Sequence, residues 1–200
     1  MQMKKVVLLG DSIRLIGYGK HVAEFLGRDY DVWQPSENSR FASFMLRQVF
    51  DHRDRIAGAD AVHFNAGLWD VCDLFGDGPF TPKEEYVATL LRAVSVLKQQ
   101  GAGTLIFATT TPAGPGKKDH SIERTAEYNR AAVEALKREG VIINDLFGLV
   151  STDIGAYIRP DDMLHLTERA EIVCAKQTAD IIAASITAAA GKRTPGSGNR

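Results

Sequence analysis

KKVVLLGDSI, residues 4–13, is the stretch that decides the fold. Its apolar part, Lys5–Leu9, is too short for a helix and ends in Gly10-Asp11-Ser12, which predicts a buried β-strand followed by a tight turn. Polar residues directly after a buried strand are typical of the ligand-binding edge of a parallel sheet. The segment Gly10–Gly17 lacks the G-x-G-x-x-G spacing of a dinucleotide-binding loop and is no P-loop, which disfavours a Rossmann-type function.

Four more short apolar segments follow along the chain, separated by longer segments with helical spacing. The predicted strands are Lys5–Leu9, Tyr30–Trp33, Ala61–Asn65, Thr104–Thr109 and Val141–Asn144, and the predicted helices are Gly19–Leu26, Ala42–Ile56, Pro82–Gln99, Ile122–Arg138 and Glu168–Ala189. This alternation predicts an α/β fold, a flavodoxin-like three-layer α/β/α sandwich with a five-stranded parallel sheet.

Several helix boundaries carry capping residues. Thr81, Pro82 and Glu84 have the spacing of a capping box with proline at the first helical position. Ser121 and Thr167 are the expected N-caps of the last two long helices. These signals fix where three of the predicted helices begin.

Length and composition fit one domain. A chain of 200 residues that is 44% hydrophobic can close one sizeable core. We expect this domain to cover residues 1–190. Residues 191–200 hold no apolar side chain to bury, so they are expected to form a flexible tail.

Charge and targeting signals narrow the partners. A formal net charge of −1 provides no field that attracts nucleic acid or an anionic membrane, so the expected partner is a small or neutral molecule. We find no uninterrupted apolar run of the length of a membrane span and no signal peptide. A cytoplasmic protein is expected, or a secreted one if a leader has been removed.

Cysteine and histidine positions suggest no metal or disulfide. Cys72 and Cys174 are far apart and form neither a disulfide framework nor a ligand pair. The histidines at 21, 52, 63 and 120 show no ligand spacing. No cofactor or metal is therefore expected.

Three residues at opposite ends of the chain suggest nucleophilic catalysis. Ser12 follows the first strand, and Asp162-Met163-Leu164-His165 precedes the last helix. A serine hydroxyl needs an imidazole to take its proton, and the imidazole needs a carboxylate to orient it. Asp162 and His165 lie about one turn apart, so they can face the same way. We therefore predict Ser12, Asp162 and His165 as a catalytic triad.

Two blocks resemble a known family. Gly10-Asp11-Ser12-Ile13 is similar to the nucleophile block of the SGNH (GDSL-like) hydrolases, and Asp162-Met163-Leu164-His165 is similar to their D-x-x-H block. The resemblance covers Lys4 to about Ala184. Tyr128-Asn129 and the segment Ile143–Phe147 resemble the carbohydrate-esterase-like members. The resemblance implies the SGNH hydrolase fold and a reaction that needs no cofactor.

The middle blocks depart from the family pattern. The backbone N–H groups of Ser12 and Ser39 match the family's backbone oxyanion donors, with Ser39 in place of the usual glycine. The third block, usually G-x-N-D, is Gly67-Leu68-Trp69-Asp70, so Trp69 replaces the donor asparagine. Asn65 is the preferred substitute donor, with the Trp69 indole as the alternative.

The remaining residues of these blocks have supporting roles in the prediction. Trp69 is expected to pack or face substrate, and Gly67 to shape the loop. Asp70 is expected to tie the loop down. Asn38 either braces the site or contacts substrate.

The resemblance implies a serine esterase that acts through an acyl-serine intermediate. A small acyl ester, an acetyl group on a carbohydrate, is the preferred substrate. The alternatives are a lipase or thioesterase of the same fold, with the loop 71–80 as a groove or lid, and a sugar- or nucleotide-binding α/β module without turnover. The oligomeric state is left open.

Overall fold

A parallel sheet forms the centre of the chain in a computed structural model that describes residues 3–193. The strands are β1 (Lys4–Leu9), β2 (Tyr30–Trp33), β3 (Ala61–Phe64), β4 (Thr104–Ala108) and β5 (Ile142–Asn144). Their order is β2-β1-β3-β4-β5, and every neighbouring pair is parallel. Val6 of β1 lies opposite Val32 of β2 and Ala61 of β3. The predicted five-stranded parallel sheet is thus confirmed.

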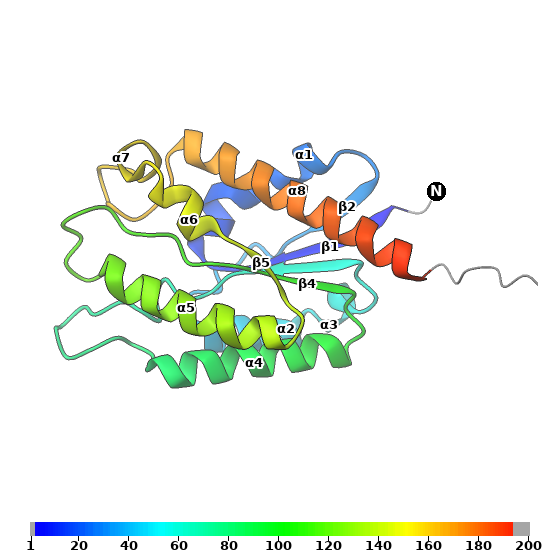
Figure 1. Ribbon diagram of the computed structural model, residues 1–200, viewed down its shortest axis with the longest axis horizontal. Helices are drawn as coiled ribbons and strands as arrows, with labels where there is room; N and C mark the ends of the chain where they lie inside the picture. The colour runs from blue at the N-terminus through cyan, green and yellow to red at the C-terminus, as the bar shows by residue number, and fades with distance from the viewer. Residues whose placement is uncertain (1–2, 194–200) are drawn as a thin grey trace, which may run out of the picture.

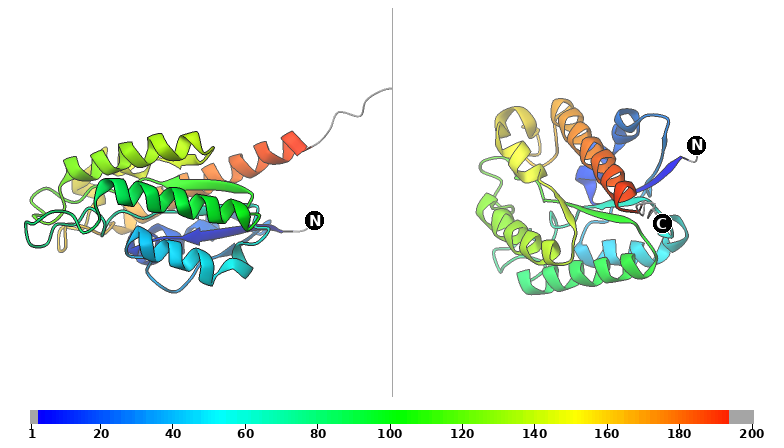
Figure 2. Two further views of the ribbon diagram at one scale, coloured as in Figure 1. Left: turned by 90° about the horizontal axis from the view of Figure 1, so that it is seen from below. Right: turned by 45° about the vertical axis from the view of Figure 1, so that its right-hand side comes forward.

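Helices cover both faces of the sheet (Figure 1). One layer contains α2 (Ala42–Asp51), α3 (Arg53–Ile56), α4 (Lys83–Gln99) and α5 (Ile122–Arg138). The other contains the π-helix η1 (Ile13–Gly17), the 3₁₀-helix η2 (Tyr18–Lys20), α1 (Val22–Leu26), α6 (Leu146–Ser151), α7 (Ile154–Tyr157) and α8 (Glu168–Arg193). Figure 2 shows the same layers from two further sides.

Two separate cores result from the pleat of β1. Val7 and Leu9 are fully buried in the cluster on the α2–α4 side, and Val6 and Leu8 in the cluster on the α1–α8 side. Successive side chains of a strand point to opposite faces, so a strand covered on both sides is apolar throughout. The run VVLL therefore forms an interior strand of the sheet, with helices on both of its faces.

The boundaries differ from prediction at several elements. The predicted helix Ala42–Ile56 is broken at His52, whose φ of −105° and ψ of 22° end α2 and whose ring packs edge-on against Trp33. The predicted helix Gly19–Leu26 is shorter because η2 occupies its start. The predicted strand ends at residues 65, 109 and 141 lie outside the strands.

The capping predictions are mixed. Ser121 accepts a hydrogen bond from the Arg124 N–H at 3.1 Å, and Thr167 accepts one from the Ala170 N–H at 3.3 Å, so both N-caps are confirmed. The capping box at Thr81 is wrong. Pro82 is extended, with φ −53° and ψ 142°, so α4 begins one residue later, and the Thr81 side chain hydrogen-bonds to Asp70 instead.

The last helix extends beyond its predicted end. Residues 191–193 complete α8, and the rest of the predicted tail lies outside the described residues. Over Glu168–Gly191 the length and mean hydropathy of 1.2 reach those of a membrane span, because alanines fill the gaps between scattered charges. Buried residues of α8, including Ala170, Cys174 and Ile182, pack in the core on one face of the sheet. This contact is that of a core helix.

Replacing Ser121 by alanine is expected to lower the free energy of unfolding by about 1 kcal/mol, because the Arg124 N–H at the start of α5 loses its acceptor. Ser95→Ala is the matched control. Ser95 is exposed in the middle of α4, where alanine is the better helix former. Urea titration of both variants measures the difference, and equal midpoints would show that the cap contributes nothing.

Candidate active site

Ser12 lies at the carboxyl end of β1, where the chain turns into η1. The Asp11 carboxylate accepts the Ile13 N–H at 2.9 Å, and its carbonyl accepts the Leu15 N–H at 3.0 Å. These bonds fix the turn that presents the Ser12 hydroxyl. In the described part of the chain, no hydrogen bond uses the Ser12 N–H.

Gly10 is required by a close approach. A Cβ atom at this position would lie 1.9 Å from Oδ1 of Asn65. That distance is far below van der Waals contact, so only glycine lets the strand end pass beneath the Asn65 side chain. The glycine of the quoted stretch therefore places Ser12 and Asn65 at one edge of the sheet.

Asp162 and His165 come from a tight turn before α8. The His165 N–H and the Leu164 N–H both donate to Asp162 Oδ1, at 3.0 and 2.9 Å. Met163 lies between them with φ of 55°, and its carbonyl accepts the Gly114 N–H at 2.8 Å. The turn thus holds the carboxylate under the imidazole.

The predicted triad residues meet although they are distant in sequence. His165 Nε2 lies 2.9 Å from Ser12 Oγ, and His165 Nδ1 lies 2.8 Å from Asp162 Oδ2. A carboxylate next to Nδ1 favours the tautomer that keeps the proton there, which leaves Nε2 free to accept the serine proton. The arrangement is able to activate a hydroxyl for nucleophilic attack.

The neighbouring aspartates differ in surroundings. Partial burial raises the pKa of Asp162, but hydrogen bonds from the His165 N–H, the His165 ring and the Leu164 N–H outweigh it and lower the pKa to about 2. Asp162 is therefore charged at neutral pH. Asp161 is exposed and pairs with Arg159 instead.

Asn65 is held in one orientation beside the turn. The Tyr18 hydroxyl donates to Asn65 Oδ1 at 3.0 Å, so the amide nitrogen is the remaining end of the side chain. Burial raises the pKa of Asp11, while a hydrogen bond with the Asn65 side chain lowers it. Asn65 directly follows β3, as Ser12 closely follows the neighbouring strand β1, so both residues lie at the carboxyl edge of the sheet.

Ser39 does not fit the predicted donor role. Its N–H already donates to the Gly10 carbonyl at 3.0 Å, and its buried hydroxyl donates to Gln48 Oε1 at 2.5 Å. Asn38 accepts the Arg40 N–H at 2.8 Å, which braces the loop. The backbone of the loop after β2 thus points the Ser39 N–H toward β1. The residue type at position 39 does not predict this direction.

Arg14 is a residue that the sequence analysis missed. Its buried guanidinium donates to the carbonyls of Gly10, Pro35 and Glu37 at 2.8–2.9 Å. Burial lowers the pKa of Arg14, while the neighbouring Tyr18 and Asp11 raise it. An arginine that follows the serine on a short helix carries no sequence signal of burial.

The segment Gly67–Asp70, the third block, is held in place by buried contacts. Asp70 is fully buried and accepts the Ala42 N–H at 3.0 Å, which ties this loop to the start of α2 as predicted. Trp69 packs with Phe41 and Phe80, with ring centroids 5.9 and 6.2 Å apart. A Cβ on Gly67 would lie 2.2 Å from Thr110 Oγ1, so this position also demands glycine.

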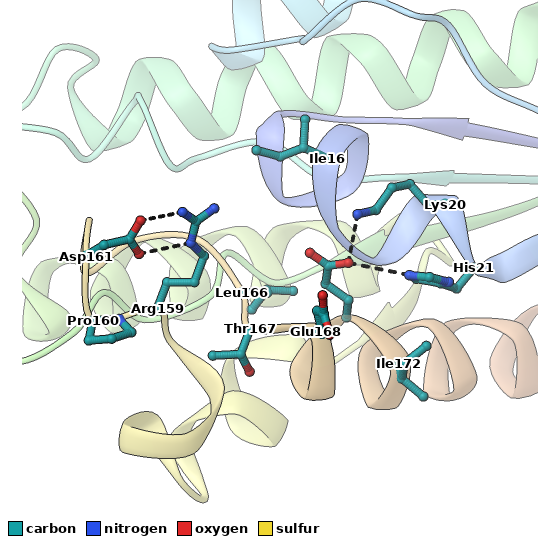
Figure 3. A pocket seen from close by; sticks show the side chains of 11 residues that line it. Ile16, Lys20, His21, Arg159, Pro160, Asp161, Leu166, Thr167, Glu168 and Ile172 are labelled. Carbon is teal, nitrogen blue, oxygen red and sulfur yellow. Dashed lines mark hydrogen bonds and ion pairs between the residues drawn. The ribbon is translucent and has the colours of Figure 1, made fainter.

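A cavity of about 730 Å³ lies beside the triad turn (Figure 3). Arg159, Pro160, Asp161 and Leu166 line it and belong to the same turn as Asp162 and His165. Lys20, on its other side (Figure 3), pairs with the Glu171 carboxylate at 2.8 Å, and both residues line the cavity. Polar groups of both charges thus border this space.

Comparison with known proteins identifies the fold. No family model and no curated protein sequence matches the chain. Among solved structures, a lipase/acylhydrolase from Enterococcus faecalis is similar, with TM-score 0.74 and 18% identity over 90% of this chain and 95% of that one. An acetyl xylan esterase, AlAXEase, has TM-score 0.73 and 15% identity over 88% and 98%. A catalytic mutant of an acetylxylan esterase from Geobacillus stearothermophilus has TM-score 0.70 and 17% identity over 91% and 95%. The predicted three-layer α/β/α fold is thus shared with these proteins.

Stability is expected to depend on the ionisation of Asp70. Burial raises the pKa of this carboxyl to about 6, so the folded chain binds the proton more tightly than the unfolded chain, whose pKa is 3.8. The contribution of Asp70 to the unfolding free energy is therefore full below pH ~4 and is lost as pH rises to ~6, by an amount on the order of 2–3 kcal/mol.

Urea unfolding of the parent and of Asp70→Asn, from pH 4 to 7, measures this contribution. The difference between the two unfolding free energies should fall across the interval and then level off, because asparagine does not titrate. A difference independent of pH would contradict the raised pKa.

Proposed function

We propose that the chain is a serine esterase that removes a small acyl group, an acetyl group on a carbohydrate in the preferred case, through an acyl-serine intermediate. The observation that carries this proposal is the continuous hydrogen-bonded chain from Ser12 Oγ through His165 to Asp162. The names of the similar structures, an acylhydrolase and acetylxylan esterases, support an ester as substrate.

The mechanism follows from the positions of the atoms. Ser12 Oγ attacks the ester carbonyl as its proton moves to His165 Nε2, and Asp162 stabilises the imidazolium that forms. The imidazolium then protonates the leaving alcohol, which leaves the acyl group on Ser12. Water, activated by the same imidazole, attacks the acyl-serine and releases the acid.

The oxyanion is assigned to two donors in this proposal. The Ser12 N–H has no partner among the hydrogen bonds of the described residues, and the Asn65 amide at the end of the neighbouring strand is assigned as the second donor because Tyr18 already occupies its oxygen. Donors of this kind act on the charge that develops in the transition state. Ser39 is left out because Gly10 occupies its N–H.

A longer acyl group is the second candidate. The loop that follows β3 exposes Leu74, Phe75 and Phe80, with 83% of Phe75 accessible to solvent. Exposed apolar groups on a loop that follows the carboxyl end of a strand can bind an apolar chain. p-Nitrophenyl esters of increasing acyl length separate the candidates. Activity that falls beyond acetyl and propionyl supports the small-acyl proposal, and activity that rises with length replaces it with a lipase or thioesterase.

Replacing Ser12 or His165 by alanine is expected to lower kcat on p-nitrophenyl acetate by about 10⁴-fold or more, because each removes the activated nucleophile. Asp162→Asn should lose about as much through the wrong imidazole tautomer. Asp161→Asn is the matched control and should retain activity, since Asp161 pairs with Arg159 outside the triad.

Covalent labelling provides an independent readout of the nucleophile. A fluorophosphonate should modify Ser12 in the parent and in Asp161→Asn but not in Ser12→Ala. An unlabelled parent would instead indicate a sugar- or nucleotide-binding module without turnover, because such a module has no activated hydroxyl.

Asn65→Ala is expected to lower kcat by about 10²–10³-fold with little change in KM, because the donor acts in the transition state. Tyr18→Phe keeps the ring but frees the Asn65 amide to rotate, so a smaller loss in kcat is expected. Trp69→Phe should alter mainly KM, since Trp69 packs in an aromatic cluster. Full kcat in Asn65→Ala, with a loss in Trp69→Phe, would move the donor role to the indole.

A further inference from the structure

Three side chains with metal-binding atoms lie close together near the segment Gly67-Leu68-Trp69-Asp70. Cys72 lies in the loop that follows β3, and Asp119 and His120 lie just before α5. The thiol, one carboxylate oxygen and an imidazole nitrogen all lie within 4.8 Å of one another. The sequence predicts no metal, because the histidines show no ligand spacing and Cys72 and Cys174 form no ligand pair. The fold brings the two segments together, as shown by the Asp73 N–H, which donates to the Asp119 carbonyl at 2.8 Å.

The tautomer of His120 follows from its buried partner. His120 Nε2 lies 3.0 Å from the Leu68 carbonyl, which can only accept, so Nε2 carries a proton. Only 6% of His120 is exposed, and burial lowers its pKa, although Asp119 opposes this shift. With the proton on Nε2, Nδ1 of the neutral ring holds a lone pair.

That lone pair has no donor. Nδ1 of His120 is buried and makes no hydrogen bond in the described structure. Oδ1 of Asp119, which is also an acceptor, lies 3.4 Å from it. Two acceptors that face each other repel, and a cation bound to both removes this repulsion.

The charges around the thiol are mixed. The pKa of Cys72 is raised to about 11, mainly by burial and also by Asp119 and Asp73, while Lys117 and Arg124 act in the opposite direction. Lys117 Nζ lies 3.4 Å from Asp119, and Arg124 pairs with Asp73 at 3.2 Å. The negative charges of both aspartates destabilise an isolated Cys72 thiolate, whereas they stabilise a divalent cation next to it. Lys117 competes for Asp119 from the same loop, two residues earlier in the chain, and its side chain is only partly buried.

We propose that Cys72, Asp119 and His120 bind one zinc ion, with water in the fourth position. Sulfur, nitrogen and oxygen donors from three side chains are a ligand set that zinc accepts in tetrahedral geometry. The hydrogen bond from His120 Nε2 to the Leu68 carbonyl is the support that a metal-bound histidine ordinarily has on its second nitrogen.

The ion would join two loops rather than take part in ester chemistry. Its ligands come from the loop that carries Trp69 and Asp70 and from the segment before α5, whereas Ser12 and His165 lie on other elements. On binding, the Cys72 thiol gives its proton to solvent and the thiolate sulfur bonds to zinc. Each ion therefore releases one proton, and affinity rises with pH.

Equilibrium dialysis of the full chain, freed of metal with a chelator and then titrated with Zn²⁺, tests the proposal. The parent should bind one ion per chain with an increase in melting temperature. With Co²⁺ as the probe, a thiolate-to-cobalt charge-transfer band should appear. Cys72→Ala and His120→Ala should weaken Zn²⁺ binding by about 100-fold or more. Loss of a residue that only hydrogen-bonds to a metal ligand already lowers metal affinity by about 10–100-fold.

Cys174→Ala is the matched control, because Cys174 is also buried but lies in α8. It should keep both the stoichiometry and the cobalt band. Asp119→Asn keeps the side-chain size and should weaken binding even if another variant fails to fold. A parent that binds no ion stoichiometrically would overturn the proposal, as would a cobalt–thiolate band that persists in Cys72→Ala. None of these measurements depends on esterase activity.

Discussion

The guanidinium of Arg14 donates to the backbone carbonyls of Gly10, Pro35 and Glu37 from a place without solvent exposure. The Gly10 carbonyl also accepts the Ser39 N–H, so the end of β1 and the loop after β2 are joined at one oxygen. Burying a cation is costly unless it is compensated, and here the carbonyls and nearby Asp11 do so. The turn that presents Ser12 and the loop that faces it therefore keep one relative position.

Much of the architecture is predictable because its signals are local. The run Lys5–Leu9 places apolar side chains on both faces of a sheet, so it fits a strand that helices cover on both sides. The alternation of strands and helices then implies a parallel sheet. The spacing of Asp162 and His165 likewise encodes a turn whose geometry depends on few neighbours. The meeting of Ser12 with His165 follows because the carboxyl ends of parallel strands share one edge.

What sequence could not predict depends on contacts between distant segments. The backbone direction at Ser39 is set by Gly10 and Gln48, and the break at His52 by Trp33. The burial of Arg14 requires the nearby Gly10 carbonyl and two carbonyls from the loop after β2. The group around Cys72 needs two loops that only the folded chain brings together. Residue type and periodicity carry none of this information.

The hydrogen bond between Ser12 and His165 spans 153 positions of the chain. During synthesis the segment with Ser12 emerges first, and the turn with His165 emerges just before α8, which must pack on the sheet before the turn is fixed. Contacts of such high sequence separation form late, since the loop between them must close at an entropic cost. Under the proposed function, a growing chain is inert toward esters until its final helix docks, so esterase activity recovered on refolding would report the completion of the whole sandwich.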